Sequence, residues 1–325
     1  MLQYLFASAL TVARMPLNCL FNFVDPPVVV LVYHRVTALR SDPEMLAVTP
    51  DNFRAQMRYL RETVPVVRFE DDWSQIKKPA VAITFDDGYA DNVLEALPIL
   101  EEVRVPATFF VSTGNIGTHR EFWWHELERL ILGEKNIPPR FILNDNCFGR
   151  EWTTGTVAER WDFYHGLVAL MNKVDARLRG NWLIQLRHWA QENEVKAGIH
   201  RAMTVEELRR LASSEWVTIG AHTITHTRLS SLPVEGQREE IVESKRQLEA
   251  WAGRGIPVFS YPFGRRCDYT RESVALCRKA GFIKVAANFP GVTHSWTDPY
   301  QIPRRLVRNW PVEIFARKLG GFWIR

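Results

Sequence analysis

Cysteine is scarce in this sequence. Its 325 residues include four cysteines, at positions 19, 147, 267 and 277, and no two of them form a Cys-x-x-Cys pair. The spacing therefore predicts neither a cysteine zinc cage nor a disulfide framework, and it favours a reducing compartment. Internal repeats and low-complexity linkers are lacking as well, so the chain can form one large domain or two small ones.

The sequence also lacks an apolar run with the length of a membrane span, which needs about 20 residues. Residues 1–24 are apolar, but Arg14 and Asn18 interrupt them, and the basic region that opens a secretory signal is absent. We expect residues 1–24 to form an amphipathic helix that packs on the rest of the protein, with a position on a membrane surface as the alternative. These features predict a cytoplasmic protein.

A strong excess of one charge is missing too. The chain has 41 lysines and arginines against 37 acidic residues, a net charge of +4, and the basic residues are spread along it. This balance argues against a dedicated nucleic-acid-binding protein, although it allows weak attraction to anionic membranes or glycolipids. A hydrophobic content of 46% with 24% charged residues is typical of a soluble globular domain.

The most informative stretch that is present joins an apolar run to two carboxylates. Residues 81–85 predict a buried strand, Asp86 and Asp87 follow it directly, and Gly88 permits a sharp turn. Two adjacent acids repel each other, which costs stability unless a cation lies between them or one of them acts as a base. A solvated Asp-Asp-Gly turn is the alternative interpretation.

A second apolar run ends in two histidines. Residues 216–221 predict a strand, and His222 and His226 come after it. The spacing brings both rings to one face of a helix, and a turn at a strand end can also make them converge. One carboxylate and two histidines suit zinc, iron, cobalt or nickel, and three protein ligands leave room for water and substrate.

A third strand pattern ends at residues 259–264, where Pro262 and Gly264 close it. Three strand ends with polar residues are what an α/β barrel presents at the mouth of its sheet. We therefore expect the three stretches to meet in space.

Together the three stretches resemble the motifs of the polysaccharide deacetylase family, carbohydrate esterase family 4, also called the NodB-homology domain. Residues 84–88 (Thr-Phe-Asp-Asp-Gly) match its first motif, residues 222–226 (His-Thr-Ile-Thr-His) the second, and residues 261–264 (Tyr-Pro-Phe-Gly) the core of the third. Their order and rough spacing agree with the family, and the resemblance extends from about Val28 to near Asn309.

The resemblance implies an α/β fold, a distorted and incomplete (β/α) barrel over residues 25–325, and the alternation of strand and helix patterns also predicts a mainly parallel sheet. At about 119–202 the alternation stops, and helix patterns with a hairpin pattern at 141–152 replace barrel strands. We expect this mainly helical insertion to lie over the site, as a lid or as a stabilising flap. A capping box at Thr204 and Glu207 marks the return of barrel helices.

The resemblance implies metal-dependent removal of an N-acetyl group from an amino sugar. Asp87, His222 and His226 would hold the divalent ion, which we expect to be zinc, with cobalt, nickel or iron as alternatives. Asp86 would be the general base that takes a proton from the attacking water. The backbone N–H of Phe263 would complete an oxyanion hole.

Two parts of the family pattern are missing. The late Leu-x-His motif that often supplies the proton for the leaving amine is absent, so His34, after the predicted first strand, is the first candidate acid and His294 the second. The arginine that orients the catalytic aspartate is not found a few residues before the third motif. The candidates that could replace it are Arg254, Arg265 and Arg304, with Asp298 as the acidic partner of one of them.

For the substrate we expect contacts with Tyr261, Pro262 and Trp124, and Arg304 is a further candidate. The predicted function is deacetylation of a bacterial glycan or lipid-linked saccharide in surface polysaccharide or lipopolysaccharide assembly, in the cytoplasm or peripherally at the inner membrane. The alternatives are a non-catalytic carbohydrate-binding protein on the same fold and a deacylase of a different N- or O-acyl group. An iron oxygenase with a two-histidine, one-carboxylate triad is a third, but such sites usually occur in all-β folds.

Overall fold

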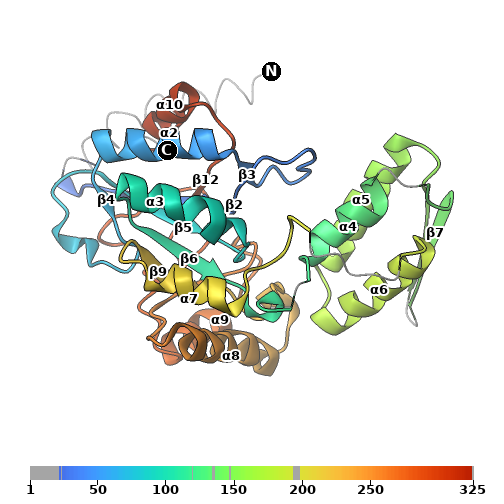
Figure 1. Cartoon of the computed structure of the whole chain (residues 1–325). Helices are drawn as coiled ribbons and strands as arrows, with labels where there is room; N and C mark the ends of the chain where they lie inside the picture. The colour runs from blue at the N-terminus through green and yellow to red at the C-terminus, as the bar shows by residue number, and fades with distance from the viewer. Residues whose placement is uncertain are drawn as a thin grey trace, which may run out of the picture.

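Eight parallel strands form the centre of the structure, a computed structural model that describes residues 22, 24–118, 120–133, 136–145, 148–192 and 198–323 (Figure 1). The order across the sheet is β11-β10-β9-β6-β5-β1-β12, and β4 pairs with the first half of β5. The strands are β1 (Val28–Tyr33), β4 (Val66–Val67), β5 (Ala80–Phe85), β6 (Ala107–Val111), β9 (Val217–Ala221), β10 (Val258–Ser260), β11 (Lys284–Ala286) and β12 (Arg305–Leu306).

The apolar runs of the sequence explain the middle of this sheet. Every residue of β1 and of β5 is buried, as expected for parallel strands that are covered on both faces. The two edge strands, β11 and β12, do not pair with each other, and Ile302 makes one parallel bridge to Ala286 just before β12. The sheet is thus a curled, incomplete (β/α) barrel, which confirms the predicted fold class.

Helices cover the outside of the sheet (Figure 1). The capping box predicted at Thr204 and Glu207 is present at the start of α7, and Pro311 immediately precedes α10, the last helix. The helices around the barrel are α2 (Pro50–Thr63), α3 (Leu97–Val103), α7 (Val205–Ser213), α8 (Val234–Ala252), α9 (Arg271–Lys279) and α10 (Val312–Phe322). The shorter elements are β2 (Arg35–Val36), β3 (Ala47–Val48), the 3-10 helices η1 (Trp73–Gln75), η3 (Thr113–Asn115) and η4 (Leu229–Ser231), and the π-helix η2 (Asn92–Ala96).

A second body of helices lies beside the barrel, on the right in Figure 1. We call it the helical lobe. It contains an antiparallel hairpin in which Phe141 pairs with Trp152, at the position where the sequence predicted one. Its elements are α4 (Trp123–Leu132), β7 (Arg140–Asp145), β8 (Phe148–Thr153), α5 (Val157–Met171) and α6 (Ala176–Trp189).

The predicted N-terminal helix falls mainly outside the described residues, of which only Asn22 and Val24 belong to it. Within the described part of the chain, every helix is too short or too polar to cross a bilayer. Cys267 and Cys277 are free thiols, and the other two cysteines are outside the description.

Parallel pairing brings the carboxyl ends of the strands to one edge of the sheet. His34 follows β1, the acid pair follows β5, His222 follows β9, and Tyr261 follows β10. The residues that the motifs single out therefore start from the same end of the barrel, the end at which α/β barrels carry their sites.

Candidate active site

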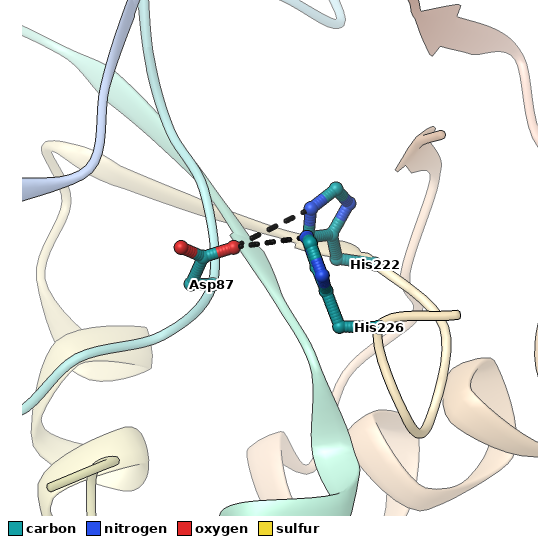
Figure 2. A group of neighbouring side chains, drawn as sticks. All are labelled: Asp87, His222 and His226. Atoms are coloured by element: carbon teal, nitrogen blue, oxygen red, sulfur yellow. Dashed lines mark ion pairs between the residues drawn. The ribbon is translucent and has the colours of Figure 1, made fainter. Parts of the chain in front are cut away.

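Three candidate metal ligands meet at this end of the barrel (Figure 2). Asp87 Oδ1 lies 3.6 Å from His222 Nε2 and 3.4 Å from His226 Nε2. Two ligand atoms bound to one ion at about 2.1 Å are separated by roughly 3–3.5 Å. The three side chains are therefore already spaced for a shared divalent ion.

The backbone is strained where it presents these ligands. Asp87, Thr223 and His226 have left-handed φ angles of 78°, 64° and 51°, which non-glycine residues rarely adopt and which usually mark functional sites. Gly88 has a φ of 91°, and a Cβ there would come within 2.8 Å of Val111 Cγ1. The sharp turns after β5 and β9 aim the carboxylate and the two imidazoles at one point.

Unpaired polar atoms indicate that an ion fits between these side chains. His222 Nδ1 donates to the backbone oxygen of Ser260 at 2.7 Å, which leaves the lone pair on Nε2, the atom that faces Asp87. Asp87 Oδ1 and His226 Nδ1 are buried without a hydrogen-bond partner among the described residues. A buried carboxylate oxygen without a partner is costly, and a divalent ion held by Asp87, His222 and His226 would satisfy it.

Burial controls the protonation of the three candidate ligands. It lowers the pKa of His222 and holds that of His226 well below its ordinary value, so both rings are neutral, which is the form that binds metals. Burial, followed by the adjacent Asp86 carboxylate, raises the pKa of Asp87. A cation in the site would favour the ionised form of Asp87 and offset this repulsion.

Asp86 is held by a buried arginine. Arg304 donates from Nη1 to Oδ1 at 2.7 Å and from Nη2 to Oδ2 at 2.6 Å. The same guanidinium donates to the Ala287 backbone oxygen at 2.7 Å and to Ser260 Oγ at 2.9 Å. Burial alone would raise the pKa of Asp86, but Arg304 and then His222 outweigh burial and hold it well below its usual range. Asp86 is thus an ionised and oriented carboxylate beside the candidate ligands.

The expectation that Arg304 contacts the substrate is corrected. Its side chain is almost fully buried, and its donors are used on Asp86 and on the barrel wall. It is the arginine that orients Asp86. Asp298, expected as the acidic partner of an orienting arginine, instead pairs with Arg278 at 3.1 Å.

The other two arginine candidates are not at Asp86. Arg254 donates to the Val217 backbone oxygen at 2.9 Å, at the amino end of β9. Arg265 lines the cavity in front of the site but pairs with Asp268 at 3.2 Å. These two predictions are corrected, because the orienting role belongs to a residue far later in the chain.

The two candidate acids lie at opposite ends of the barrel. His34 lines the cavity at the site, and burial, partly offset by Asp86, lowers its pKa to about 4, so the free imidazole is neutral. His294 Nδ1 lies 3.1 Å from the Asp25 backbone oxygen, next to residue 293, which bridges to Val28 at the start of β1. The prediction that His294 acts as an acid is wrong, since its loop returns to the amino end of the sheet.

A cavity of about 740 Å³ opens in front of the candidate ligands, and Trp124 and Phe263 line it. The Trp124 ring centroid is 4.9 Å from that of His226, and its Nε1 donates to the Tyr89 hydroxyl at 2.8 Å. Phe263 has a φ of 59°, and its backbone N–H makes no hydrogen bond within the part of the chain that the structure describes. Trp124 is thus positioned to contact a ligand, and the Phe263 N–H is free to donate to one.

Two residues expected to bind substrate are core residues instead. Tyr261 is fully buried, stacks on Tyr269 with ring centroids 4.1 Å apart, and donates from its hydroxyl to the Tyr300 backbone oxygen at 3.2 Å. Pro262 is also buried, and neither it nor Tyr261 lines the cavity. These two predictions are corrected. The chain bends inward one residue later, at Phe263.

Sequence reasoning missed the residues that support the loop between the two histidines. Glu240, on α8, accepts hydrogen bonds from the backbone N–H groups of Ile224 at 2.7 Å and Thr225 at 3.0 Å. Arg179, on α6 of the helical lobe, donates to the Thr225 backbone oxygen at 2.8 Å. A single glutamate or arginine in a helix normally faces solvent, so no signal in the sequence distinguished these two.

Comparisons with known proteins show the family of the chain. The family model described as polysaccharide deacetylase matches residues 74–133 and 180–283, and it leaves much of the helical lobe unmatched. The chain is similar to YxkH of Bacillus subtilis (strain 168), a protein that carries the name polysaccharide deacetylase. The two sequences are 21% identical over 282 residues, which cover 85% of this chain and 69% of that protein.

Solved structures show the same fold. A polysaccharide deacetylase from Bacillus cereus is similar with a TM-score of 0.58 and 19% identity, over 93% of this chain and 70% of that one. The Streptococcus pyogenes deacetylase PplD, solved in complex with acetate, is similar with a TM-score of 0.56 and 16% identity, over 90% of this chain and 98% of that one. At these identities the likeness supports the architecture, the incomplete barrel.

Proposed function

The chain belongs to the polysaccharide deacetylase family, and from this premise we propose that it hydrolyses N-acetyl groups on amino sugars of a bacterial glycan or lipid-linked saccharide. The observation that carries the proposal is the buried Asp86 carboxylate. Arg304 orients it, and it adjoins the candidate ligands, with Oδ2 3.9 Å from His222 Nε2. A site that only bound sugar would have no need of an ionised base beside a metal.

A divalent ion held by Asp87, His222 and His226 would lower the pKa of a water molecule and polarise the amide carbonyl. The ligand set suits zinc, and it also suits cobalt, nickel or iron. Asp86 takes the proton of the attacking water. Its low pKa keeps it ionised and so able to accept a proton, Arg304 fixes its two oxygens, and a water made more acidic by a metal would need only a weak base. Arg304 keeps the carboxylate from rotating, so the base meets the water in one orientation.

Two further groups complete the reaction. The Phe263 backbone N–H donates to the oxyanion that forms on the carbonyl oxygen, and it has no competing partner among the described residues. His34 passes a proton to the departing amine, which would otherwise leave as an unstable anion. Because its imidazole is neutral in the free protein, it must first take up that proton, and the proton that Asp86 removes from the attacking water is the source. His34 is the candidate acid that lines the cavity.

We also propose that the reaction serves surface polysaccharide or lipopolysaccharide assembly on the cytoplasmic side of the inner membrane. The free thiols of Cys267 and Cys277 are in keeping with a reducing compartment. Fractionation of cells that express the tagged chain tests the location. Recovery of a processed protein from outside the cytoplasm would overturn this part of the proposal.

The function is tested by measuring acetate release from N-acetylhexosamine glycans and lipid-linked sugars, with and without a chelator. We expect Asp86→Asn to lower kcat by about 10²–10⁴-fold, the usual contribution of a general base, while it still binds metal in a 1:1 ratio. Asp51→Asn, at a fully exposed carboxylate on α2, is the matched control and should keep wild-type activity.

The proposal is supported if the chelator abolishes the activity of the wild type, if added metal restores it, and if Asp86→Asn is inactive. Stoichiometric metal binding without acetate release from any substrate would reject it, and would favour a carbohydrate-binding protein or a deacylase of another acyl group. Release of an acid other than acetate from an N- or O-acylated sugar would favour the deacylase over the carbohydrate-binding protein.

A further inference from the structure

The cavity at the candidate active site extends beyond the metal ligands, and its outer wall is cationic. The segment that follows Arg304 contributes Arg305 and Arg308 to this wall, and α10 contributes Lys318. Outside the acid pair at the ligands, Glu44 is the one carboxylate among the described lining residues. The chain as a whole has nearly balanced charge, 41 basic against 37 acidic residues, so the excess here is local.

Arg308 and Lys318 keep their positive charge available in this wall. Arg308 Nη1 donates to the backbone oxygens of Glu44, at 2.6 Å, and of Met45. Asp42 and Glu44 are close enough to act on the charge of Arg308 and partly offset the effect of burial on its pKa, but among the described residues its donors go to backbone oxygens. Backbone oxygens position a guanidinium but do not neutralise it, so the wall keeps charge available for an anionic ligand.

Aromatic rings lie beside two of these cations. Lys318 Nζ is 5.5 Å from the centroid of the Trp310 ring, and the Arg305 guanidinium is 5.3 Å from that of Phe322. Both rings line the cavity. Cation–π attraction holds these two groups beside the rings. Arg305 is half-buried and Lys318 is exposed, so the positive charge stays accessible to an anion.

We infer that the substrate of this site is an amino sugar that carries a phosphate or diphosphate ester. Its acetamido group lies at Asp86 and Asp87, and its phosphate is bound at the outer wall by Arg308 and Lys318, with Arg305 beside them. This inference rests on the proposed function. Phosphate is favoured over a sugar carboxylate, because several cations on one wall match a group with more than one negative charge and several acceptor oxygens.

Two sources share this chemistry, a sugar linked to a nucleotide and a sugar linked to a polyprenyl carrier. The experiment compares kcat/KM for acetate release from four forms of one N-acetylhexosamine: the neutral methyl glycoside, the 1-phosphate, the nucleotide diphosphate ester, and the polyprenyl diphosphate ester in detergent micelles. We expect each phosphorylated form to exceed the methyl glycoside by at least about tenfold, the effect of one charge-assisted hydrogen bond. The form with the highest value identifies the source.

Variants test whether the cationic wall causes the higher kcat/KM on the phosphorylated sugars. The double variant Arg308→Gln, Lys318→Gln should lose about 10–100-fold in kcat/KM on the phosphorylated forms, from two such contacts, and should stay near wild type on the methyl glycoside. Lys318→Gln alone removes an exposed charge together with its contact to the Trp310 ring, and urea unfolding of this variant shows whether the fold is kept. Arg317→Gln, one position earlier on α10 and exposed, is the control and should change neither value.

A binding measurement separates this inference from the proposed function. Titration of inorganic pyrophosphate into chelator-treated protein should show binding that survives Asp86→Asn and is lost in the double variant. Equal turnover of the neutral and phosphorylated sugars, with pyrophosphate binding unchanged by the double variant, would overturn the inference and leave the deacetylase in place. Pyrophosphate binding that depends on Arg308 and Lys318, without deacetylation of any form, would reject the proposed function and support the anion site.

Discussion

Arg304 and Asp86 form a buried, two-point ion pair across 218 positions of the sequence. Because the same guanidinium also bonds the Ala287 backbone oxygen and Ser260 Oγ, the orientation of the carboxylate depends on several strands at once. The candidate base is thereby fixed by the barrel itself rather than by its own loop.

We predict that Arg304→Gln lowers kcat by about 100-fold or more with little change in KM, because the base loses its orientation and its anionic form is no longer favoured. Leaving Asp86 buried without a partner should also cost roughly 3–5 kcal/mol in the free energy of unfolding. Arg304→Lys keeps the charge but not the planar fork, so it should recover part of the stability and little of the rate.

Steady-state kinetics and urea unfolding of the two Arg304 variants check this. The control Arg317→Gln should match wild type in both measurements. An unchanged kcat in Arg304→Gln, in protein that is still folded, would contradict the orienting role.

Glu240 offers a prediction about metal affinity. Its carboxylate accepts hydrogen bonds from two backbone N–H groups and from the Thr225 hydroxyl, all in the loop between the two histidines. Glu240→Ala should weaken metal binding by about 10–100-fold, the usual cost of losing a residue that orients the ligands. Competition with a chromophoric chelator measures it, with the exposed Glu239→Ala as control. Equal affinity in the two variants would mean that the loop keeps its shape without Glu240.

Trp124 should act on substrate binding rather than on the chemical step. It forms a wall of the cavity next to His226, and removing an aromatic contact of this kind costs about 1–1.5 kcal/mol. Trp124→Ala should therefore raise KM by about tenfold and change kcat much less. Trp161→Ala, on α5 and outside the cavity, is the control. A fall in kcat with constant KM would instead assign Trp124 to the reaction itself.

The junction between the barrel and the helical lobe should lose stability in acid. The His125 and His200 ring centroids are 4.3 Å apart, and Arg35 Nη1 lies 2.7 Å from His200 Nδ1. Burial, followed by neighbouring positive charge, lowers the pKa of His200 to about 3 and holds that of His125 well below its ordinary value. Tyr89 and Glu128, which also contact His125, do not reverse these shifts.

The direction of the pH effect follows from proton linkage. In the unfolded chain both imidazoles take up a proton near pH 6.5, whereas in the folded chain they stay neutral to much lower pH. The free energy of unfolding should thus fall as the pH drops from about 7 toward 4. Urea unfolding at several pH values should show a shallower fall for His200→Gln than for wild type. The exposed His165→Gln is the control, and the same slope in all three proteins would refute the assignment.

The sequence predicted the strand ends well because a parallel sheet brings its carboxyl ends together. β-branched runs located β1 and β5, and Asp87, His222 and His226 then had to start from one edge. Arg304 was only one of three candidates, because an ion pair across 218 positions depends on how the last strand packs on the sheet. Local patterns carry no information on such pairing.

The failures have equally specific causes. Tyr261 and Phe263 are two residues apart, but the left-handed φ of Phe263 bends the chain so that the first packs in the core and the second faces the cavity. His294 is not at the site because its loop returns to the start of β1, where Thr293 bridges to Val28. The cationic wall was not predicted, because Arg308 and Lys318 come from a strand end and a helix that meet only in the folded protein.

The left-handed residues Asp87, Thr223 and His226 make the site depend on the rest of the barrel. Their unfavourable dihedrals are adopted during folding, when the packing of the whole barrel can compensate for them. The geometry of the ligands therefore rests on the stability of the whole domain. A substitution that loosens the barrel core far from the site should also disturb the positions of these three residues.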